Sequence, residues 1–152
     1  MNKNRQIIIE KNAEDVRNEC NIADYGIKDI FEVSEKLGYR TIRYPIGPEA
    51  FLGFAMIKDS ERIAFSNSSL ILSREMFSVA HEIGHQRLHL CEQGRTLIKD
   101  DDFNERDELE VEANYFAACL LMPKDKIEKF IRFELKDKDI EKWDGLDIAK
   151  IQ

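Results

Sequence analysis

This chain of 152 residues has no long apolar run, few cysteines and no surplus of positive charge. Its apolar runs stay well below the ~20 residues of a membrane-spanning helix, so we expect no membrane segment. The run at residues 7–9 is too short for a signal peptide. Three widely spaced cysteines favour a reduced, cytoplasmic protein over a disulfide framework, and they do not support a cysteine-rich zinc site.

The charge balance bears on the kind of partner. A net charge of −7, without a basic stripe carrying interleaved aromatic residues, argues against direct binding to nucleic acid. A basic protein partner would be electrostatically easier. The length suits a single domain over residues 1–152 that is large enough to bury a core. The sequence has no internal repeat and no low-complexity linker that would divide it.

The motif His-Glu-Ile-Gly-His at residues 81–85 is the strongest indication of function in the sequence. His81 and His85 are four residues apart, so on a helix they lie one turn apart on the same face and can bind one Zn²⁺ ion. Glu82 is then within reach of a metal-bound water as a general base. Ser73 is a suitable N-cap for this helix and Gly94 a suitable stop. Gly84 costs helix stability, which indicates close approach by another backbone or a substrate.

A hydrolytic zinc site needs a third protein ligand and an open position for water. The metzincin pattern is excluded, because Cys91 stands where its third histidine would be. His89 lies further along the same helix, where ligation strains tetrahedral geometry, so we interpret it as a packing residue or as a partner of a ligand. The remaining choice is a carboxylate from a later helix, predicted over residues 105–122 and ended by Pro123.

Three glutamates of that helix are available: Glu108, Glu110 and Glu112. We interpret Glu108 and Glu110 as a solvated first turn. Glu112 lies deepest in the apolar part of the helix, where a carboxylate is costly unless it is paired or metal-bound. The residues alone leave both a metal ligand and a salt bridge to Arg or Lys open for Glu112.

Residues 74–89 resemble the active-site helix of the ImmA/IrrE family of metallopeptidases, and residues 110–123 resemble that family's second signature. The two blocks have the family's order and spacing, and the resemblance covers residues 10–125. It implies that His81, His85 and Glu112 bind Zn²⁺ and that Glu82 is the general base. The segment 126–152 forms a helical tail that is shorter than the family leads us to expect, which bears on substrate recognition.

The resemblance also implies a fold and a substrate. The fold would be α+β and zincin-like, with a small three-stranded antiparallel sheet packed against the active-site helix and further helices before and after. The substrate would be a helix-turn-helix transcriptional repressor from a mobile-element or stress-response circuit, cleaved at one site. The alternative is a zinc-containing binding module that antagonises a repressor, or partners a toxin, by contact alone. A plain structural zinc domain would need a fourth protein ligand, and the sequence offers no convincing one.

The other elements follow from periodicity and turn residues. We expect helices at 12–20 and 27–38, strands at 39–44, 51–57 and 62–65, and helices after Pro123 and over 140–151. Gly53 within a strand marks a bulge or a close substrate approach, and the edge of strand 51–57 suits a peptide bound by strand addition. Residues 100–102 read as a solvated loop. Tyr115 and His89 are candidate oxyanion donors.

Overall fold

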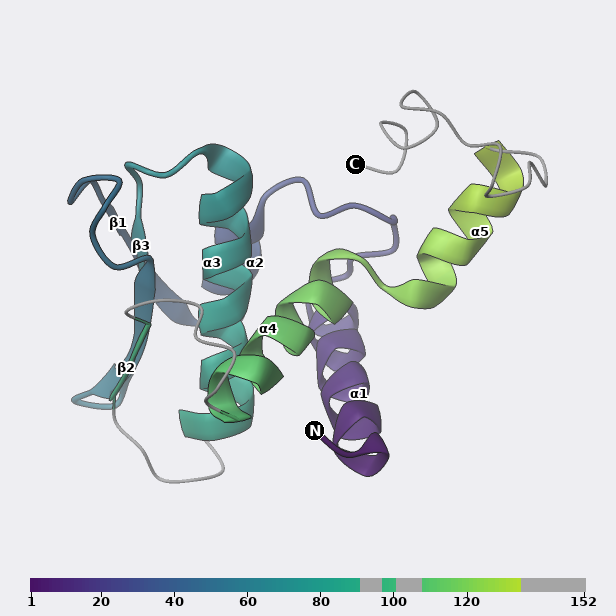
Figure 1. Ribbon diagram of the computed structural model, residues 1–152, viewed down its shortest axis with the longest axis horizontal. Helices are drawn as coiled ribbons and strands as arrows, with labels where there is room; N and C mark the ends of the chain where they lie inside the picture. The colour runs from purple at the N-terminus through teal and green to yellow at the C-terminus, as the bar shows by residue number, and fades with distance from the viewer. Residues whose placement is uncertain (91–96, 101–107, 135–152) are drawn as a thin grey trace.

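The computed structural model describes residues 1–90, 97–100 and 108–134 (Figure 1). Its elements, in chain order, are α1 (Lys3–Glu19), α2 (Ile30–Lys36), β1 (Tyr39–Tyr44), β2 (Gly53–Lys58), β3 (Glu61–Asn67), α3 (Leu72–His85), the π-helical turn η1 (Gln86–Leu90), β4 (Leu97–Asp100), α4 (Glu108–Leu121) and α5 (Lys124–Glu134). The predicted helix at 140–151 and the stop at Gly94 lie outside the described residues, as do Asp101 and Asp102. The single-domain interpretation therefore stays a prediction.

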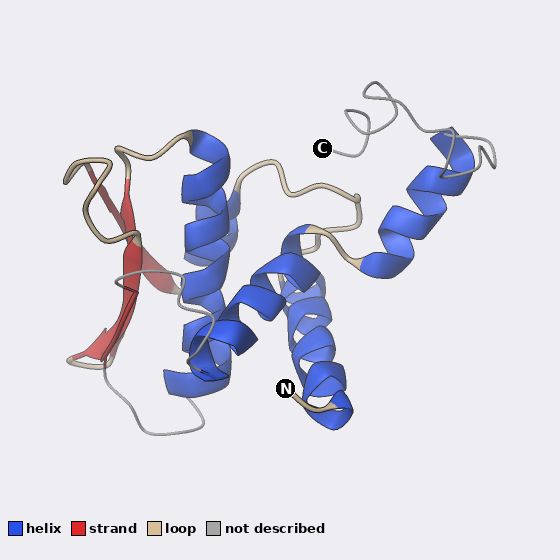
Figure 2. Cartoon of the chain, viewed as in Figure 1, coloured by secondary structure: helices blue, strands red, loops and turns tan. Residues whose placement is uncertain are grey.

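The architecture is α+β, with a sheet on one side of α3 and helices on the other (Figure 2). The sheet has four strands in the order β1-β3-β2-β4. β2 and β3 form a hairpin whose two turn residues, Asp59 and Ser60, both have positive φ, as a type I′ turn requires. The fold class is confirmed, but the prediction of a purely antiparallel three-stranded sheet is wrong.

The difference lies at the two edges of the sheet. The segment between β1 and β2 carries the chain past β3, so β1 pairs with β3 in parallel, Tyr39 opposite Arg62. β4 pairs antiparallel with β2, Gly53 opposite Asp100. β4 therefore covers residues 53–56 of the edge that was predicted to be free. A peptide could add as a strand along these residues only by displacing β4.

The main core lies where α1, α2, α3 and α4 meet. Its fully buried members include Ile9, Ile30, Ile83, Phe116 and Leu120. α4 crosses α3 and α1, as Figure 1 shows. Gly84 allows the crossing, because a Cβ there would lie 3.3 Å from the Ala113 Cα and 3.0 Å from the Phe116 ring. The close backbone approach predicted from Gly84 is thus that of α4.

Three helix starts differ from the predictions. α2 covers Ile30–Lys36, where a helix over 27–38 was expected. α1 begins at Lys3 rather than at residue 12, with the Asn2 side chain accepting a hydrogen bond from the Arg5 amide as its N-cap. Ile7 and Ile8 are exposed and only Ile9 is buried in this stretch, so the first turns of α1 lack a full apolar stripe. α3 begins at Leu72, with Ile71 as N-cap, so Ser73 is not the cap.

The last described helix follows Pro123 as predicted. α5 contacts the rest of the chain through Phe130, whose ring stacks on that of Tyr25 at 5.4 Å between centroids, and through Lys126, which donates to the Ala23 carbonyl oxygen. Phe133 on this helix is exposed. Among the described helices, none combines the length and the apolar character needed to cross a membrane.

Candidate metal centre

α3 is held against the sheet at both ends. Near its start the buried Glu75 accepts two hydrogen bonds from Arg43 of β1, at 2.8 and 2.7 Å, and one from Ser66 of β3 at 3.0 Å. Directly after its end, the buried Gln86 donates to two backbone carbonyls of the hairpin, those of Met56 and Ile63, at 3.1 and 2.9 Å. These contacts fix the position of the His-Glu-Ile-Gly-His turn against β2 and β3.

Three side chains that could bind a metal ion converge between α3 and α4. The Nε2 atoms of His81 and His85 lie 2.8 Å apart, and the Glu110 carboxylate oxygens lie 3.1 Å from His81 Nε2 and 3.3 Å from His85 Nε2. All three residues are buried. Tetrahedral zinc with bonds of ~2.0–2.1 Å spaces its ligand atoms about 3.3 Å apart. The donor set and its spacing therefore fit a zinc ion.

The hydrogen bonds behind the two imidazoles determine their tautomers. His81 Nδ1 lies 3.0 Å from Asn114 Oδ1, and because an amide oxygen only accepts, His81 donates from Nδ1. His85 Nδ1 lies 2.8 Å from His89 Nδ1, and His89 Nε2 lies 3.2 Å from a Glu112 carboxylate oxygen. His89 donates to that carboxylate, so its Nδ1 accepts from His85. In this network both inner Nε2 atoms carry lone pairs that point to one place, as metal ligands must.

The protonation state of His85 agrees with this arrangement. Burial lowers the pKa of His85 from 6.5 to about 4, so its imidazole is neutral at pH 7. The site thus offers two imidazoles and one carboxylate, the set found in one class of catalytic zinc sites.

Glu82 is completely buried and lies against β2. A Cβ at Gly53 would be 2.7 Å from Glu82 Oε1 and 2.9 Å from Ser78 Oγ. Gly53 therefore leaves room for the carboxylate next to the metal-binding turn. Gly53 was predicted to mark a bulge or a close approach by substrate; in the structure it marks the close approach of Glu82.

The structure does not bring Glu112, the carboxylate predicted as third ligand, to His81 and His85. Glu112 instead pairs with Arg5 of α1, through two bonds of 2.9 and 2.7 Å, and with His89. Burial raises the pKa of Glu112, but Arg5 and His89 outweigh it and lower the pKa overall. Of the two interpretations that the residues left open, this arrangement matches the salt bridge.

The interpretation of Glu110 as part of a solvated turn is wrong, since it is 8 % exposed, whereas Glu108 is exposed as predicted. A signal was present in the sequence. Glu110 stands three, seven and ten residues before Ala113, Ala117 and Leu120, which form the buried stripe of α4. The small side chains of that stripe let α4 approach Gly84, and this brings Glu110 to the histidines.

The other candidates are also placed. His89 is buried, and its Nδ1 lies 2.8 Å from His85 Nδ1. The Tyr115 hydroxyl donates to Glu10 of α1, so it serves the contact between α4 and α1. The structure therefore favours neither residue as an oxyanion donor.

Together, the α+β fold and a His-His-Glu cluster on two crossed helices define a protein of the metallopeptidase type. The model of the peptidase M78 family, described as the IrrE N-terminal-like domain, matches residues 34–148, and the chain belongs to this family. It is also 26 % identical over 125 residues to "Uncharacterized immunity region protein 2" of Bacillus phage phi105, an alignment that covers 82 % of this chain and 78 % of the phage protein.

Proposed function

We propose that this protein is a zinc-dependent endopeptidase in which His81, His85 and Glu110, rather than Glu112, bind the metal. The observation that carries the proposal is the convergence of two Nε2 lone pairs and a carboxylate at 2.8–3.3 Å from one another in a buried site. A bound zinc ion would lower the pKa of a coordinated water to about 7 and polarise the scissile carbonyl.

Glu82 is the general base in this proposal. It follows His81 directly in the chain, and its carboxylate lies against Gly53 of β2. A carboxylate held beside the ligands, yet outside the group of three, is available to take the proton of the attacking water and to deliver it to the leaving amine. His81 and His85 keep their Nδ1 protons, which they donate in hydrogen bonds to Asn114 Oδ1 and His89 Nδ1.

For the substrate we propose a helix-turn-helix transcriptional repressor, cleaved in the cytoplasm at one site. The membership in the M78 family supports a protein substrate, and the name of the phage relative places that protein in an immunity region. The net charge of −7 suits a partner with a basic surface, such as a DNA-binding repressor.

The test compares the wild type with Glu82→Gln on a purified repressor encoded beside the gene, with cleavage followed by mass spectrometry. Gln keeps the shape of Glu82 but cannot accept the proton. We expect full zinc content and a rate lower by about 10²–10⁴-fold. Cleavage by the variant at the wild-type rate would overturn the role of Glu82. Equal relief of repression by both proteins would overturn the peptidase function and leave a protein that acts by contact.

A further inference from the structure

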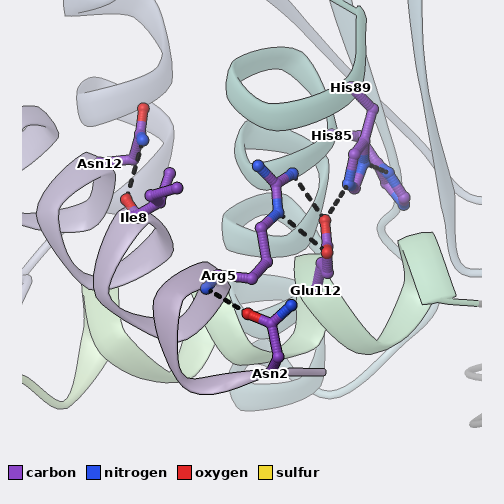
Figure 3. A network of polar contacts seen from close by, with 7 residues as sticks. All are labelled: Asn2, Arg5, Ile8, Asn12, His85, His89 and Glu112. Atoms are coloured by element: carbon purple, nitrogen blue, oxygen red, sulfur yellow. Dashed lines mark hydrogen bonds and ion pairs between the residues drawn. The ribbon is translucent and has the colours of Figure 1, made fainter. Parts of the chain in front are cut away.

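A continuous chain of polar contacts runs from α1 to the back of His85 (Figure 3). Arg5 donates from Nε and Nη2 to the two oxygens of Glu112, at 2.9 and 2.7 Å. Glu112 accepts from His89 Nε2 at 3.2 Å, and His89 Nδ1 lies 2.8 Å from His85 Nδ1. Four elements contribute to this chain: α1, α4, the π-helical turn η1 and α3, which ends at His85.

Each contact determines the direction of the next. The Arg5 guanidinium only donates, so Glu112 is held as an acceptor toward both of its partners. Glu112 therefore requires a proton on His89 Nε2, which leaves His89 Nδ1 as an acceptor. That acceptor draws the proton of His85 to Nδ1 and directs the lone pair of Nε2 toward His81 and Glu110.

We propose that Arg5, Glu112 and His89 are positioning residues that fix the tautomer and the ring orientation of His85, which makes α1 part of the metal centre. The inference rests on the proposed function, because it assumes that His85 is a metal ligand. It extends the centre beyond the family match at residues 34–148, since Arg5 precedes that region. Asn114 fixes the tautomer of His81 in the same way, by accepting a hydrogen bond from His81 Nδ1.

The geometry is more specific than a surface ion pair would need to be. His89 is completely buried and has one partner at each ring nitrogen. An apolar side chain could fill the same buried space, so the two polar contacts are the specific contribution of a histidine here. Arg5 and Glu112 are only 22 % and 15 % exposed. Partners behind a ligating histidine change metal affinity by about 10–100-fold when they are lost.

The test uses Glu112→Leu, which removes the acceptor, and Glu112→Gln, which keeps the shape and one oxygen. Glu108→Leu on the exposed side of the same helix is the matched control. Zinc affinity is measured by competition with a chelator, and the ring tautomers of uniformly ¹⁵N-labelled histidine are read by NMR in the zinc-free and zinc-loaded proteins.

In the wild type we expect protons on His85 Nδ1 and His89 Nε2. Glu112→Leu should weaken zinc binding by about 10–100-fold and redistribute the His89 tautomers, with Glu112→Gln between it and the wild type. Arg5→Met should act in the same direction. Tyr115→Phe, which removes another contact between α1 and α4, should leave affinity and tautomers unchanged.

Unchanged affinity and tautomers in both Glu112 variants would overturn the inference alone, provided that Glu110→Gln loses zinc. Loss of zinc in Glu112→Gln with full retention in Glu110→Gln would make Glu112 the ligand, and would overturn both the inference and the proposed ligand set. A wild type that binds no zinc would overturn the proposed function, and the positioning role with it.

Discussion

Replacing Gly53 by alanine tests whether the contact between β2 and Glu82 matters for both stability and catalysis. The added Cβ would lie 2.7 Å from Glu82 Oε1, 2.7 Å from the Phe65 carbonyl oxygen and 2.9 Å from Ser78 Oγ. Reaching an acceptable 3.0–3.4 Å requires movements of about 0.3–0.7 Å, and the Phe65 oxygen belongs to the paired backbone of β3.

Overpacking of this kind costs about 1–3 kcal/mol. For a chain of this size, that lowers the melting temperature by roughly 2–12 °C. Because Glu82 is one of the groups that must move, turnover should fall by on the order of 10²-fold, as for other small misplacements of catalytic groups. Zinc content should stay at the wild-type level, since none of the three atoms nearest to the new methyl group belongs to His81, His85 or Glu110.

The assay combines thermal unfolding, elemental analysis and the rate of repressor cleavage. Gly26→Ala is the matched control, because a Cβ at Gly26 meets nothing within 4 Å. Adding Ser78→Ala to Gly53→Ala removes one of the three close contacts and should recover part of the stability. A Gly53→Ala protein with wild-type stability and turnover would refute the reasoning about Glu82 and β2.

Two further predictions concern the protein without zinc and the connection of the site to the sheet. The zinc-free protein should lose stability as the pH falls from about 6.5 to about 4, because burial lowers the pKa of His85 to about 4 and the unfolded chain then binds a proton that the folded chain does not. The full shift corresponds to roughly 3 kcal/mol, measured by urea unfolding at stepped pH; a His85→Gln protein with the same pH slope would contradict this. Gln86→Met removes both donors to the Met56 and Ile63 carbonyls and should cost about 1–3 kcal/mol in urea unfolding, and an unchanged midpoint would contradict the role of Gln86.

Local pattern was sufficient for most elements of this protein. The strand predicted at 39–44 coincides with β1, and the hairpin, the helix carrying His81 and His85 and the helix before Pro123 all occur where periodicity and turn residues placed them. These features depend on contacts within a few residues, which a sequence displays directly. Four residues between two histidines place both on one face of any helix.

Tertiary structure decided which groups meet. Glu110 and Glu112 are two residues apart, hence on nearly opposite sides of α4, and only the docking of α4 on Gly84 determines which of them faces the histidines. Arg5 lies 107 residues before Glu112, and no local pattern connects them. The parallel pairing of β1 with β3 likewise depends on the path of the chain between strands, because hydrophobic alternation is the same for either neighbour.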